Sequence, residues 1–417
     1  MSFKLAVIGT GYVGLPLIRE AIRAGIPTFG FDIDLDRLGE MRAGRSRVDD
    51  ISDDELATML TNGFTPTAEP SDLDECDTYV ICVPTPLTED GGPDLSAVIS
   101  SAEMIAKRVR PGDLVVLEST TYPGTTEEVV GPILETSGHV VGRDILLAFS
   151  PERIDPGNPR FSLRNTPKVV GGVDERSTAR ATELYSRVCD EVVIASGTRE
   201  AELAKLLENT YRHVNIALMN ELAQLAHELD IDLWESIRCA STKPFGFHAF
   251  YPGPGVGGHC IPIDPNYLSH HIRSRLRHPF RFVELAQEIN AGMPAYVARR
   301  TQDLLNDLGR PVRGSRILLL GVTYKENIAD QRESPARDVA TALLHLGADL
   351  HYWDPYVAQW QSGGSPIPRV MDVAEAAVDM DCAILLQNHR ELTPDRLAAF
   401  GQKLLDTRGV TVTGRRL

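Results

Sequence analysis

The sequence has no apolar run long enough to cross a lipid bilayer. A membrane-spanning helix needs about 20 consecutive, mainly apolar residues, and no uninterrupted apolar stretch in the 417 residues approaches that length. Residues 1–4 (MSFK) are followed at once by the strand-like segment LAVIG, which lacks the layout of a secretory signal peptide. We therefore expect a cytoplasmic protein with no membrane partner.

Basic residues are scarce relative to acidic ones. Lys and Arg number 42 and Asp and Glu number 58, so the formal net charge is −16 at pH 7. Proteins that bind nucleic acid usually carry a broad basic surface, and this charge balance argues against nucleic acid as a partner. An anionic small ligand would need local groups that overcome a repulsive overall field.

Paired cysteine motifs are also missing. The six cysteines stand at positions 76, 82, 189, 239, 260 and 382 without a CxxC pair, so neither a disulfide framework nor a zinc site is suggested. Each cysteine is a single thiol whose role depends on its neighbours. The remaining composition, with 42% hydrophobic, 24% charged and 6% aromatic residues, is that of an ordinary globular protein long enough for two or three domains.

Short apolar runs alternate with helical segments from the start of the chain. KLAVIG, the helix-like LPLIREAIRAG and IPTFGFDID form a strand, helix, strand unit. TYVICVP, DLVVLEST, DILLAFSP and PKVVGG continue the alternation, which is typical of a mostly parallel sheet buried on both faces. We expect an N-terminal α/β domain over residues 1–195.

A long helix and a second alternation follow. From Arg199 to about Leu229, apolar residues recur at helical spacing without a proline, which predicts one long helix able to join two domains. Beyond turn residues near 308–311, SRILLLG, a helix from about Ser334, ADLHYWDP and CAILL repeat the strand and helix pattern. The predicted fold class is therefore α/β, with two Rossmann-like doubly wound domains joined by a long central helix. The expected domains are 1–195, 196–308 and 309–417.

The glycines at positions 9, 11 and 14 form a GxGxxG motif between a strand and a helix. Gly9 permits a tight turn, Gly11 lets the backbone approach a pyrophosphate, and Gly14 allows close packing of helix on strand. Asp32 ends the second strand, where a carboxylate binds an adenosine ribose and repels a 2′-phosphate. A glycine-rich turn without a ligand is the alternative. With strand, helix and acid in place, the motif predicts binding of NAD rather than NADP.

The segment YPGPGVGGHCIPID (251–264) is the most informative in the chain. Its glycines and prolines cannot continue a helix or a central strand, so we predict a loop whose backbone can press against a ligand. Cys260 follows the glycines, and Asp264 stands four residues later. A lone cysteine is most often a small buried hydrophobic residue, but the glycine-rich loop and the carboxylate favour a catalytic role for Cys260.

Two polar residues of the long helix, Lys205 and Asn209, are four residues apart and therefore share one face. They are candidates for a common site. The alternative is a solvated polar face, on which Glu202 and Glu208 are possible surface partners of the lysine.

Polar runs follow three of the predicted strands, at residues 83–86, 118–121 and 150–152. In doubly wound folds, ligands bind at the carboxyl ends of the strands. These runs are therefore candidates for ligand contacts, with ordinary turn chemistry as the alternative.

Seven segments together resemble the nucleotide-sugar 6-dehydrogenase family, which includes UDP-glucose, GDP-mannose and UDP-N-acetylhexosamine dehydrogenases. The resemblance covers nearly the whole chain, and the segments stand in the order that the family has. They are GTGYVGLP (9–16), VPTPL (83–87), ESTTYPGTTEE (118–128), SPERIDPGN (150–158), ELAKLLENTYRHVNIALMNE (202–221), YPGPGVGGHCIPIDP (251–265) and GVTYKENIADQRESPA (321–336).

The resemblance implies one Rossmann-like domain for NAD, a second for the UDP-sugar, and a central part that carries the substrate loop and builds a homodimer. It also implies roles by position. The implied catalytic residues are Cys260 as nucleophile, Lys205 and Asp264 as the pair that stabilises the oxyanion and handles protons, Asn209 and Thr120 as auxiliary polar groups, and Glu152 as the carboxylate for thioester hydrolysis. The implied NAD contacts are Gly9, Gly11, Tyr12, Val13, Gly14, Asp32, Arg37, Thr85, Thr120 and Arg332. The implied substrate contacts are Glu152, Arg153, Lys205, Asn209, Tyr251, Gly255, Gly257, Gly258 and Lys325.

The implied reaction explains why a thiol, a cation and carboxylates are needed together. Oxidation of a C6 alcohol to an acid removes two hydrides, so two NAD molecules are consumed and the aldehyde must be held between the two oxidations. A cysteine does this by forming a thiohemiacetal, which the second oxidation converts to a thioester that water hydrolyses.

Two positions bear on the identity of the sugar. His259 precedes the cysteine and Arg153 follows the glutamate, where UDP-glucose dehydrogenases commonly have a small residue and a phenylalanine. The forms GGHCIPIDP and SPERIDPGN resemble those of UDP-N-acetylglucosamine and UDP-N-acetylmannosamine 6-dehydrogenases, so we expect oxidation of a UDP-N-acetylhexosamine to its uronic acid for a surface polysaccharide or related glycoconjugate. A surface cation is the alternative interpretation of Arg153.

Three other functions stay open at this point. UDP-glucose 6-dehydrogenase activity is the alternative within the family. A non-catalytic nucleotide-sugar binding protein is the alternative from another class, although such a protein would be expected to lose Cys260, Lys205 or Asp264. A two-electron dehydrogenase is the third, but it would have no use for a thiol presented by a loop.

Overall fold

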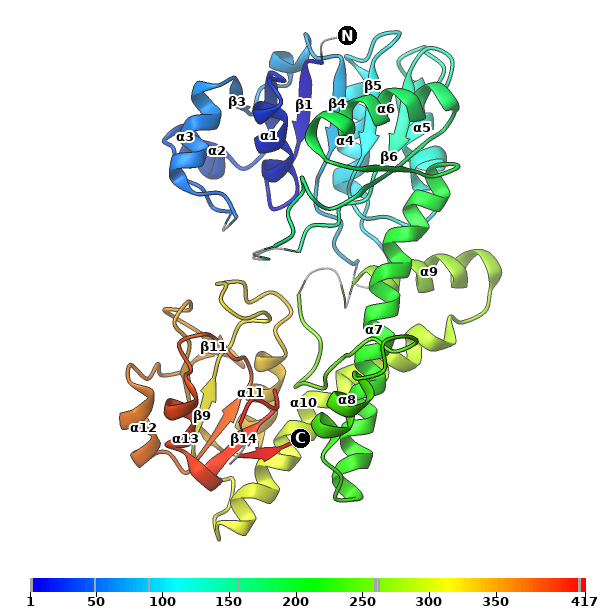
Figure 1. Ribbon diagram of the computed structural model, residues 1–417. Coiled ribbons are helices and arrows are strands. Elements are labelled where there is room, and N and C mark those ends of the chain that lie inside the picture. Colours follow the sequence, from blue (N-terminus) through cyan, green and yellow to red (C-terminus); the bar gives the residue numbers. More distant parts are fainter. Residues whose placement is uncertain are drawn as a thin grey trace. The chain divides into compact units, whose positions relative to one another are not determined.

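The computed structural model describes residues 3–48, 50–88, 91–155, 158, 160–258, 261, 263–411 and 414–417. Their helices and strands are drawn in Figure 1. The predicted nucleophile Cys260 and its neighbour His259 lie outside the described residues. The chain forms two compact units, of which the first comprises Met1–Glu208 and Asn266–Arg277, and the second comprises Asn209–Pro265 and His278–Leu417.

The first unit is built on an eight-stranded sheet with the order β3-β2-β1-β4-β5-β6-β7-β8. Its strands are β1 (Leu5–Ile8), β2 (Thr28–Phe31), β3 (Phe64–Thr67), β4 (Thr78–Ile81), β5 (Leu114–Leu117), β6 (Leu146–Phe149), β7 (Lys168–Gly172) and β8 (Val192–Ile194). The six strands from β3 to β6 are parallel, and β7 runs antiparallel to β6. The order 3-2-1-4-5-6 is that of dinucleotide-binding folds, in which ligands bind where the order reverses, here between β1 and β4.

Helices cover both faces of this sheet. They are α1 (Gly14–Arg23), α2 (Leu35–Arg42), α3 (Asp53–Thr61), η1 (Pro70–Leu73), α4 (Ser96–Ala106), η2 (Thr126–Val130), α5 (Gly131–Glu135) and α6 (Glu175–Val188), together with most of α9 (Asp264–Leu276). Alternate residues of β1 face opposite sides, as the strand period of two requires. Leu5 and Val7 pack in one core with α1 and α6, and Ala6 and Ile8 in another with α4 and α5.

Helix α6 shows how the sequence determines such an element. Asp174 precedes it, and its side chain accepts a hydrogen bond from the Ser177 N–H at 2.7 Å, which satisfies one of the free donors of the first turn. Ala181, Leu184 and Val188 are buried at a spacing of three and four residues. This apolar stripe packs on the sheet, while the charged residues of the helix face solvent.

The second unit contains a five-stranded parallel sheet with the order β10-β9-β13-β14-β15. Its strands are β9 (Arg316–Leu320), β10 (Asp349–Trp353), β13 (Cys382–Leu385), β14 (Leu404–Asp406) and β15 (Arg415–Arg416), with a separate hairpin of β11 (Gln361–Ser362) and β12 (Ser365–Pro366). Counted within the sheet, the order is 2-1-3-4-5, the other common doubly wound order. It reverses between β9 and β13.

The helices of the second unit again lie on both faces of its sheet. They are most of α7 (Thr198–Glu228), α8 (Leu233–Ala240), α10 (Arg281–Asp307), α11 (Pro335–His345), α12 (Val373–Asp379), α13 (Pro394–Ala398) and η3 (Gly401–Lys403). Ile317 and Leu319 of β9 pack with α10 and α11, and Leu318 and Leu320 pack with α12 and α13. The predicted fold class of two doubly wound sheets and a long helix is therefore confirmed.

The long helix was expected over residues 199–229, and α7 spans Thr198–Glu228. The three predicted domain boundaries stay a prediction. Of the helices formed by the described residues, none combines the length and the apolar composition that crossing a membrane requires.

Candidate functional site

The three glycines after β1 have different surroundings. Gly9 adopts a φ of +96°, and a Cβ there would lie 2.6 Å from the Cys82 carbonyl oxygen at the end of β4. A Cβ at Gly14 would collide with the Gly9 carbonyl oxygen and touch Val7. By contrast, a Cβ at Gly11 would meet no heavy atom within 4 Å. Gly9 and Gly14 are thus required by the fold, and the open space at Gly11 lets a ligand approach the backbone.

Helix α1 begins at this turn without a side-chain cap. Val13 occupies the N-cap position and makes no capping hydrogen bond, and the first turn holds no acidic residue. The first N–H groups of a helix and the positive end of its dipole bind anions such as a pyrophosphate. The turn at Gly11 and the start of α1 therefore fit the predicted diphosphate site.

Asp32 lies directly after β2 and is 6% exposed. Its carboxylate accepts hydrogen bonds from the Thr10 N–H and hydroxyl at 2.9 and 2.7 Å and from the Asp34 N–H at 3.0 Å. Burial acts to raise the pKa of Asp32, but these hydrogen bonds and the Arg37 guanidinium hold the pKa below its ordinary value. The group is therefore an ionised acceptor, as the predicted ribose contact requires.

The surroundings of Asp32 include groups that the sequence reasoning did not single out. Arg37, which the family resemblance implied, donates to the Asp32 carboxylate at 2.9 Å. Ile33 and Leu35 follow the acid in the sequence and are 86% and 68% exposed. Their sequence signal was two large apolar residues within three positions of Asp32.

The loops after β4 and β5 are joined at the same edge of the sheet. Thr85 is buried, and its hydroxyl donates to the Thr120 carbonyl at 2.8 Å. The Ser119 hydroxyl donates to the Val83 carbonyl at 2.7 Å. Since Cys82 lies against Gly9, the structure brings the predicted NAD contacts Gly9, Thr85 and Thr120 to one edge, where the strand order reverses.

Glu152 and Arg153 follow β6 and have separate environments. Glu152 is buried, and one of its carboxylate oxygens accepts a hydrogen bond from the Ile154 N–H. Arg153 donates to the Pro167 carbonyl at 2.6 Å and forms an ion pair with Glu208 of α7 at 2.8 Å. The guanidinium is thus held by the protein itself rather than extended freely into solvent.

Lys205 of α7 is buried, with 8% of its surface exposed. The alternative of a solvated face with Glu202 and Glu208 as partners is wrong. Glu208 pairs with Arg153, and Glu202 is fully buried and binds Gly124 and Thr126 instead. Sequence spacing on one helix could not show these partners, which come from other elements. Within the part of the chain that the structure describes, the Lys205 ammonium has no hydrogen-bond or ion-pair partner.

Glu202 holds the loop that follows Thr120. Its carboxylate accepts hydrogen bonds from the Gly124 N–H at 2.6 Å, and from the N–H and hydroxyl of Thr126 at 2.9 and 2.7 Å. Burial raises the pKa of Glu202 to about 7, although these donors act to lower it. The carboxyl group therefore keeps its proton in the folded protein at pH values where the unfolded chain loses it.

We expect this group to make the folded protein less stable as the pH rises. The stabilisation is fully present below a pH of about 4.5, the ordinary pKa, and is lost as the pH rises to about 7. Between pH 5 and 8, the free energy of unfolding of the wild type should fall by roughly 2 to 3 kcal/mol relative to that of Glu202→Gln. Urea unfolding at both pH values measures this difference, with Glu200→Gln on the exposed face as control. A difference that does not change with pH would contradict the prediction.

In the second unit, the structure brings together two of the predicted catalytic residues. The Asn209 side-chain amide donates a hydrogen bond to the Asp264 carboxylate at the start of α9. Asp264 is 2% exposed and Asn209 is half-buried. The amide therefore fixes the orientation of this carboxylate.

The glycines of the 251–258 loop were expected to press against a ligand, but they press against the protein. A Cβ at Gly257 would lie 2.6 Å from the Glu333 carbonyl oxygen, and one at Gly258 would lie 2.7 Å from the Tyr324 ring. Gly255 has a φ of +138°, and a Cβ there would lie 3.0 Å from Pro335. Close packing on residues 324–335 explains why glycine stands here, and backbone contacts with a substrate stay a prediction.

Lys325 lies in the loop after β9, where the order of the second sheet reverses. Three hydrogen bonds fix this loop: the Thr323 hydroxyl donates to the Lys325 carbonyl at 2.8 Å, Val322 N–H donates to Asp354 at 2.8 Å, and Asn327 N–H donates to His389 at 3.0 Å. The loop therefore occupies the usual ligand-binding edge of a doubly wound sheet.

Two arginines of the second unit, Arg332 and Arg408, are further candidates for ligand contacts. Arg332, predicted to contact NAD, is half-exposed and donates to the Asp330 carboxylate at 2.6 Å. Arg408, which follows β14, was missed. Its guanidinium lies beside Gly253, since a Cβ at that glycine would be 3.1 Å from Nη1. Burial lowers the pKa of Arg408 to about 10, so it remains a cation that can bind phosphate at neutral pH. A basic residue at a strand end was its only signal.

Tyr251, at the start of the loop, is 55% exposed. Its predicted substrate contact is compatible with this exposure and stays a prediction.

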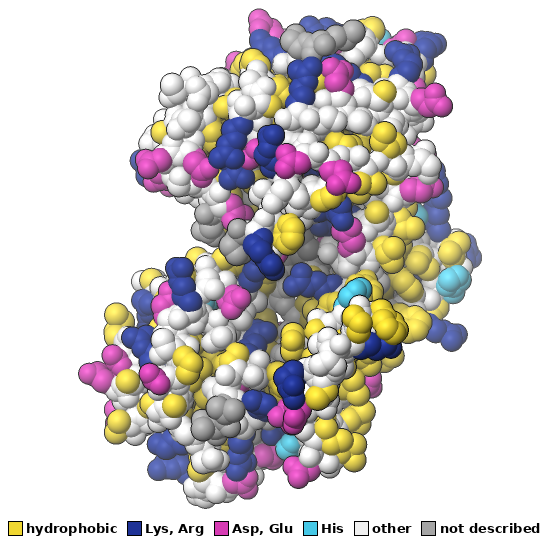
Figure 2. All heavy atoms as spheres, in the orientation of Figure 1, with side chains coloured by type: hydrophobic (Ala, Val, Ile, Leu, Met, Phe, Trp, Pro, Cys, Tyr) yellow, Lys and Arg dark blue, Asp and Glu magenta, His cyan; other side chains and the backbone are white. Residues whose placement is uncertain are grey.

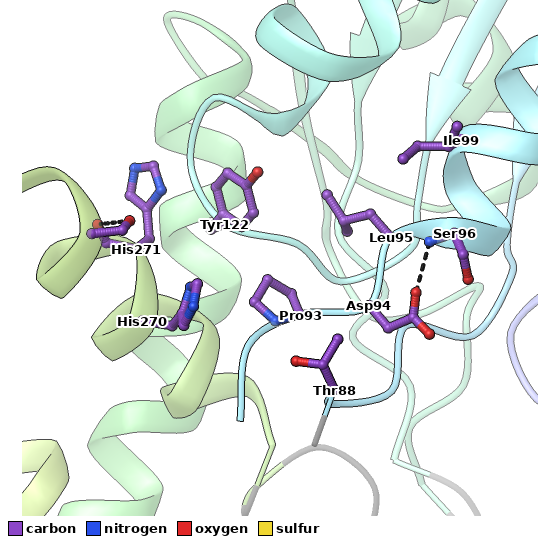
Figure 3. A pocket seen from close by; sticks show the side chains of 10 residues that line it. Thr88, Pro93, Asp94, Leu95, Ser96, Ile99, Tyr122, His270 and His271 are labelled. Carbon is purple, nitrogen blue, oxygen red and sulfur yellow. Dashed lines mark hydrogen bonds between the residues drawn. The ribbon is translucent and has the colours of Figure 1, made fainter. Parts of the chain in front are cut away.

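A separate cavity of about 450 Å³ lies in the first unit. Figure 3 shows its walls, with Tyr122, His270 and His271 on one side and the segment from Pro93 to Ser96 on another. The rings of Tyr122 and His271 are stacked with their centroids 4.5 Å apart. None of the described residues that line this cavity is a site residue predicted from the sequence.

Comparison with known proteins covers nearly the whole chain. Residues 3–189 match the NAD binding domain of the UDP-glucose/GDP-mannose dehydrogenase family, residues 199–292 match its central domain, and residues 318–416 match its UDP binding domain. These matches agree with the dinucleotide site in the first unit and with the second doubly wound sheet.

Individual relatives match over most of their length. A UDP-N-acetyl-D-mannosamine dehydrogenase of Methanococcus aeolicus is 33% identical over 393 residues, 93% of this chain and 85% of that protein. A UDP-N-acetyl-D-glucosamine 6-dehydrogenase of Salmonella typhi is 38% identical over 410 residues, 96% of this chain and 93% of that protein. The solved structure of a UDP-D-ManNAc dehydrogenase from Pyrococcus horikoshii has a TM-score of 0.89 at 30% identity, and the match covers 99% of this chain and 98% of that chain. The chain therefore belongs to the UDP-glucose/GDP-mannose dehydrogenase family of NAD-dependent nucleotide-sugar dehydrogenases.

Proposed function

We propose that this enzyme oxidises the C6 alcohol of a UDP-N-acetylhexosamine, either UDP-N-acetylglucosamine or UDP-N-acetylmannosamine, to the uronic acid. The observation that carries the substrate is the similarity over more than nine-tenths of the chain to proteins named for these two sugars. The ionised Asp32 beside the open turn at Gly11 supports NAD as the oxidant, because its carboxylate would repel the 2′-phosphate of NADP.

We assign the catalytic roles from the family resemblance and from the contacts described above. NAD, when bound, accepts a hydride in each of the two oxidations. Lys205 and Asp264 handle the proton of the alcohol through a water molecule, and the Cys260 thiolate adds to the aldehyde to form a thiohemiacetal. Lys205 stabilises the oxyanion, while Asn209 orients Asp264.

The remaining steps complete the reaction. Loss of the second hydride converts the thiohemiacetal to a thioester on the cysteine. Glu152 takes a proton from the attacking water, the C–S bond breaks, and the acid and the free thiolate are released. Thr120 would supply an auxiliary polar group.

We also propose the contacts with NAD and with the UDP-sugar that the family resemblance implies. NAD is held by the Gly9–Gly14 turn with Tyr12 and Val13, and by Asp32, Arg37, Thr85, Thr120 and Arg332. The UDP-sugar is held by Glu152, Arg153, Lys205, Asn209, Tyr251, Gly255, Gly257, Gly258 and Lys325. The fixed loop around Lys325 and the cationic Arg408 support a diphosphate site in the second unit. We place the reaction in the cytoplasm because both NAD and UDP-sugars are found there, and we assign NAD binding, dimerisation and UDP-sugar binding to residues 1–195, 196–308 and 309–417.

The enzyme is proposed to act as a homodimer, on the basis of a long apolar stripe on α7. The stripe residues recur at three-, four- and seven-residue spacing and are each more than a third exposed; they are Leu203, Leu207, Tyr211, Leu218, Leu222, Leu225 and Leu229. Figure 2 shows hydrophobic side chains gathered over the part of the second unit where α7 and α8 lie. A monomer rarely leaves so continuous an apolar face in water.

Light scattering on the purified protein tests the dimer. We expect twice the chain mass of 45.8 kDa for the wild type and a shift towards one chain mass for the double variant Leu222→Glu, Leu225→Glu, because two charges would be buried in the contact. Val378→Glu, at an 80% exposed residue of α12, is the matched control and should leave the mass unchanged. A wild type with the mass of one chain would refute the proposal.

A substrate panel tests the reaction itself. Purified protein is mixed with NAD and, separately, with UDP-N-acetylglucosamine, UDP-N-acetylmannosamine and UDP-glucose, and NADH is counted per sugar consumed. Two NADH per UDP-N-acetylhexosamine, with little from UDP-glucose, is the expected result. The reverse preference selects UDP-glucose 6-dehydrogenase activity, one NADH per product selects a two-electron dehydrogenase, and binding without NADH selects a non-catalytic protein.

A further inference from the structure

The first unit buries three charged groups beside one another at the edge of its sheet. Glu118 follows β5, Glu152 follows β6, and Lys168 is the first residue of β7, with exposures of 0%, 8% and 3%. The Lys168 Nζ lies 3.2 Å from Oε2 of Glu118 and 3.7 Å from Oε2 of Glu152. We call these three residues the Glu118–Lys168–Glu152 cluster.

The reversed direction of β7 places the lysine here. Ala148 pairs with Gly172 and Phe149 with Gly171 in the antiparallel ladder. Continuing this register beyond the strands sets Glu152 opposite Lys168. A parallel β7 would begin at the opposite edge of the sheet, so the single antiparallel pair is what brings a cation to the two carboxylates.

Two titratable groups next to Glu118, the Tyr185 hydroxyl and the Cys82 thiol, stay neutral at pH 7. The Tyr185 hydroxyl donates to Glu118, and its ring lies 5.2 Å from the Lys168 Nζ. Cys82 lies 4.0 Å from the Glu118 carboxylate. Burial raises the pKa of Tyr185 and of Cys82 well above their ordinary values.

The remaining neighbours contribute no free charge. Burial raises the pKa of Cys189, at the end of α6, to about 12. Arg153 adjoins Glu152 in the chain but is engaged by Pro167 and Glu208. Lys168 is therefore the cation that lies within 4 Å of both carboxyl groups in the part of the unit that the structure describes. Burial raises the pKa of Glu118, and the ammonium acts against this shift.

The two oxygens of Glu152 have different partners. One accepts the Ile154 N–H. The other, Oε2, is buried and has no hydrogen-bond donor among the described residues, so the ammonium of Lys168 is its nearest compensating group. An isolated buried carboxylate would take up a proton.

We propose that Lys168 is a positioning residue, which holds the Glu152 side chain in the orientation needed for hydrolysis of the thioester, and that Glu118 fixes the lysine in place. The proposal rests on the function proposed above for Glu152. The two hydride transfers do not use this carboxylate. Loss of Lys168 should therefore slow the last step and leave the oxidations fast.

Removing the cation leaves two buried carboxyl groups without a compensating charge. Such a pair titrates jointly and holds one proton to higher pH, so a smaller fraction of Glu152 is available as a base at neutral pH. In Lys168→Met we expect the acid limb of the pH profile of kcat to move up by about one unit or more. Lys168→Arg keeps the charge and should restore the wild-type profile.

Rapid mixing of Lys168→Met with NAD and the UDP-N-acetylhexosamine that the wild type oxidises gives a second readout. We expect a burst of about two NADH per active site, followed by steady turnover about tenfold or more below that of the wild type. Intact-mass analysis of the quenched protein should show the acyl adduct on Cys260. A merely structural role would lower the active fraction without producing the adduct or moving the pH profile.

Two further variants keep the test decisive. If Lys168→Met does not fold, Glu118→Gln replaces it. This variant keeps the Lys168 ammonium and removes the carboxylate that competes with Glu152 for it, so the acid limb of the pH profile of kcat should move to lower pH. An acid limb that does not move in Glu118→Gln overturns the proposal. Glu152→Gln separates the two levels of inference. Normal hydrolysis in Glu152→Gln refutes the proposed role of Glu152. A different result refutes the role of Lys168 alone: Glu152→Gln accumulates the acyl adduct, while Lys168→Met shows no adduct and keeps the wild-type pH profile.

Discussion

Replacement of Cys260 by serine is expected to abolish net formation of the uronic acid. The thiolate is a far better nucleophile at neutral pH than a serine hydroxyl, which stays protonated unless a base activates it. The aldehyde would then no longer be captured between the two oxidations. We expect kcat for acid formation to fall by about a thousandfold or more, a loss typical of removing a catalytic nucleophile.

The measurement is the count of NADH and of uronic acid per active site, with the intact mass of the quenched protein. A small amount of protein that does react should carry an ester on the new serine, since an ester is hydrolysed more slowly than the thioester. Cys239→Ser is the matched control, because Cys239 is an exposed thiol on α8 and its loss should leave kcat unchanged. Full four-electron turnover by Cys260→Ser would exclude the covalent mechanism.

Replacement of Lys205 by alanine is expected to have the second largest effect. The ammonium is buried and has no partner among the described residues, so its charge is available to an oxyanion. In the proposed reaction, an oxyanion forms in alcohol oxidation, in thiohemiacetal formation and in thioester hydrolysis. Loss of one preorganised donor commonly costs about 10²- to 10³-fold in kcat, which is roughly 3–4 kcal/mol of transition-state stabilisation.

The division between kcat and KM distinguishes this role from simple substrate binding. A group that acts mainly in the transition state lowers kcat and kcat/KM together and changes KM little. Lys107→Ala, at an exposed residue after α4, is the control and should leave both constants unchanged. Since alanine is a better helix former than lysine, Lys205→Ala should fold. An unchanged kcat would remove Lys205 from the active site.

Local patterns in the sequence were sufficient for the fold class and for the prediction of a dinucleotide-binding turn. The alternation of apolar runs and helices predicted both doubly wound sheets, because a strand buried on two faces and a helix with one apolar stripe have different periods. The turn at Gly9 and the acid at Asp32 were equally local, since each is defined by its position after one strand.

The glycine-rich loop shows where a local pattern has two explanations. Glycines were expected in the 251–258 loop because a ligand approaches the backbone, yet the Cβ positions of Gly257 and Gly258 are occupied by Glu333 and Tyr324 of the same unit. The sequence contains the same signal in either case. Only the position of the 324–335 segment distinguishes packing within the protein from contact with a ligand.

The sequence by itself determined the two sheets and the long helix, and it predicted the turn for NAD and, through the family resemblance, the set of proposed catalytic residue types. Only the tertiary structure decided which charges meet. Glu202 turned inward to the loop after Thr120, Glu208 turned to Arg153, and the reversal of β7 set Lys168 between two carboxylates. The physical reason is that turns and amphipathic periods are encoded within a few neighbouring residues, whereas these polar partners lie 16 to 78 residues apart in the sequence and meet only through strand order and direction.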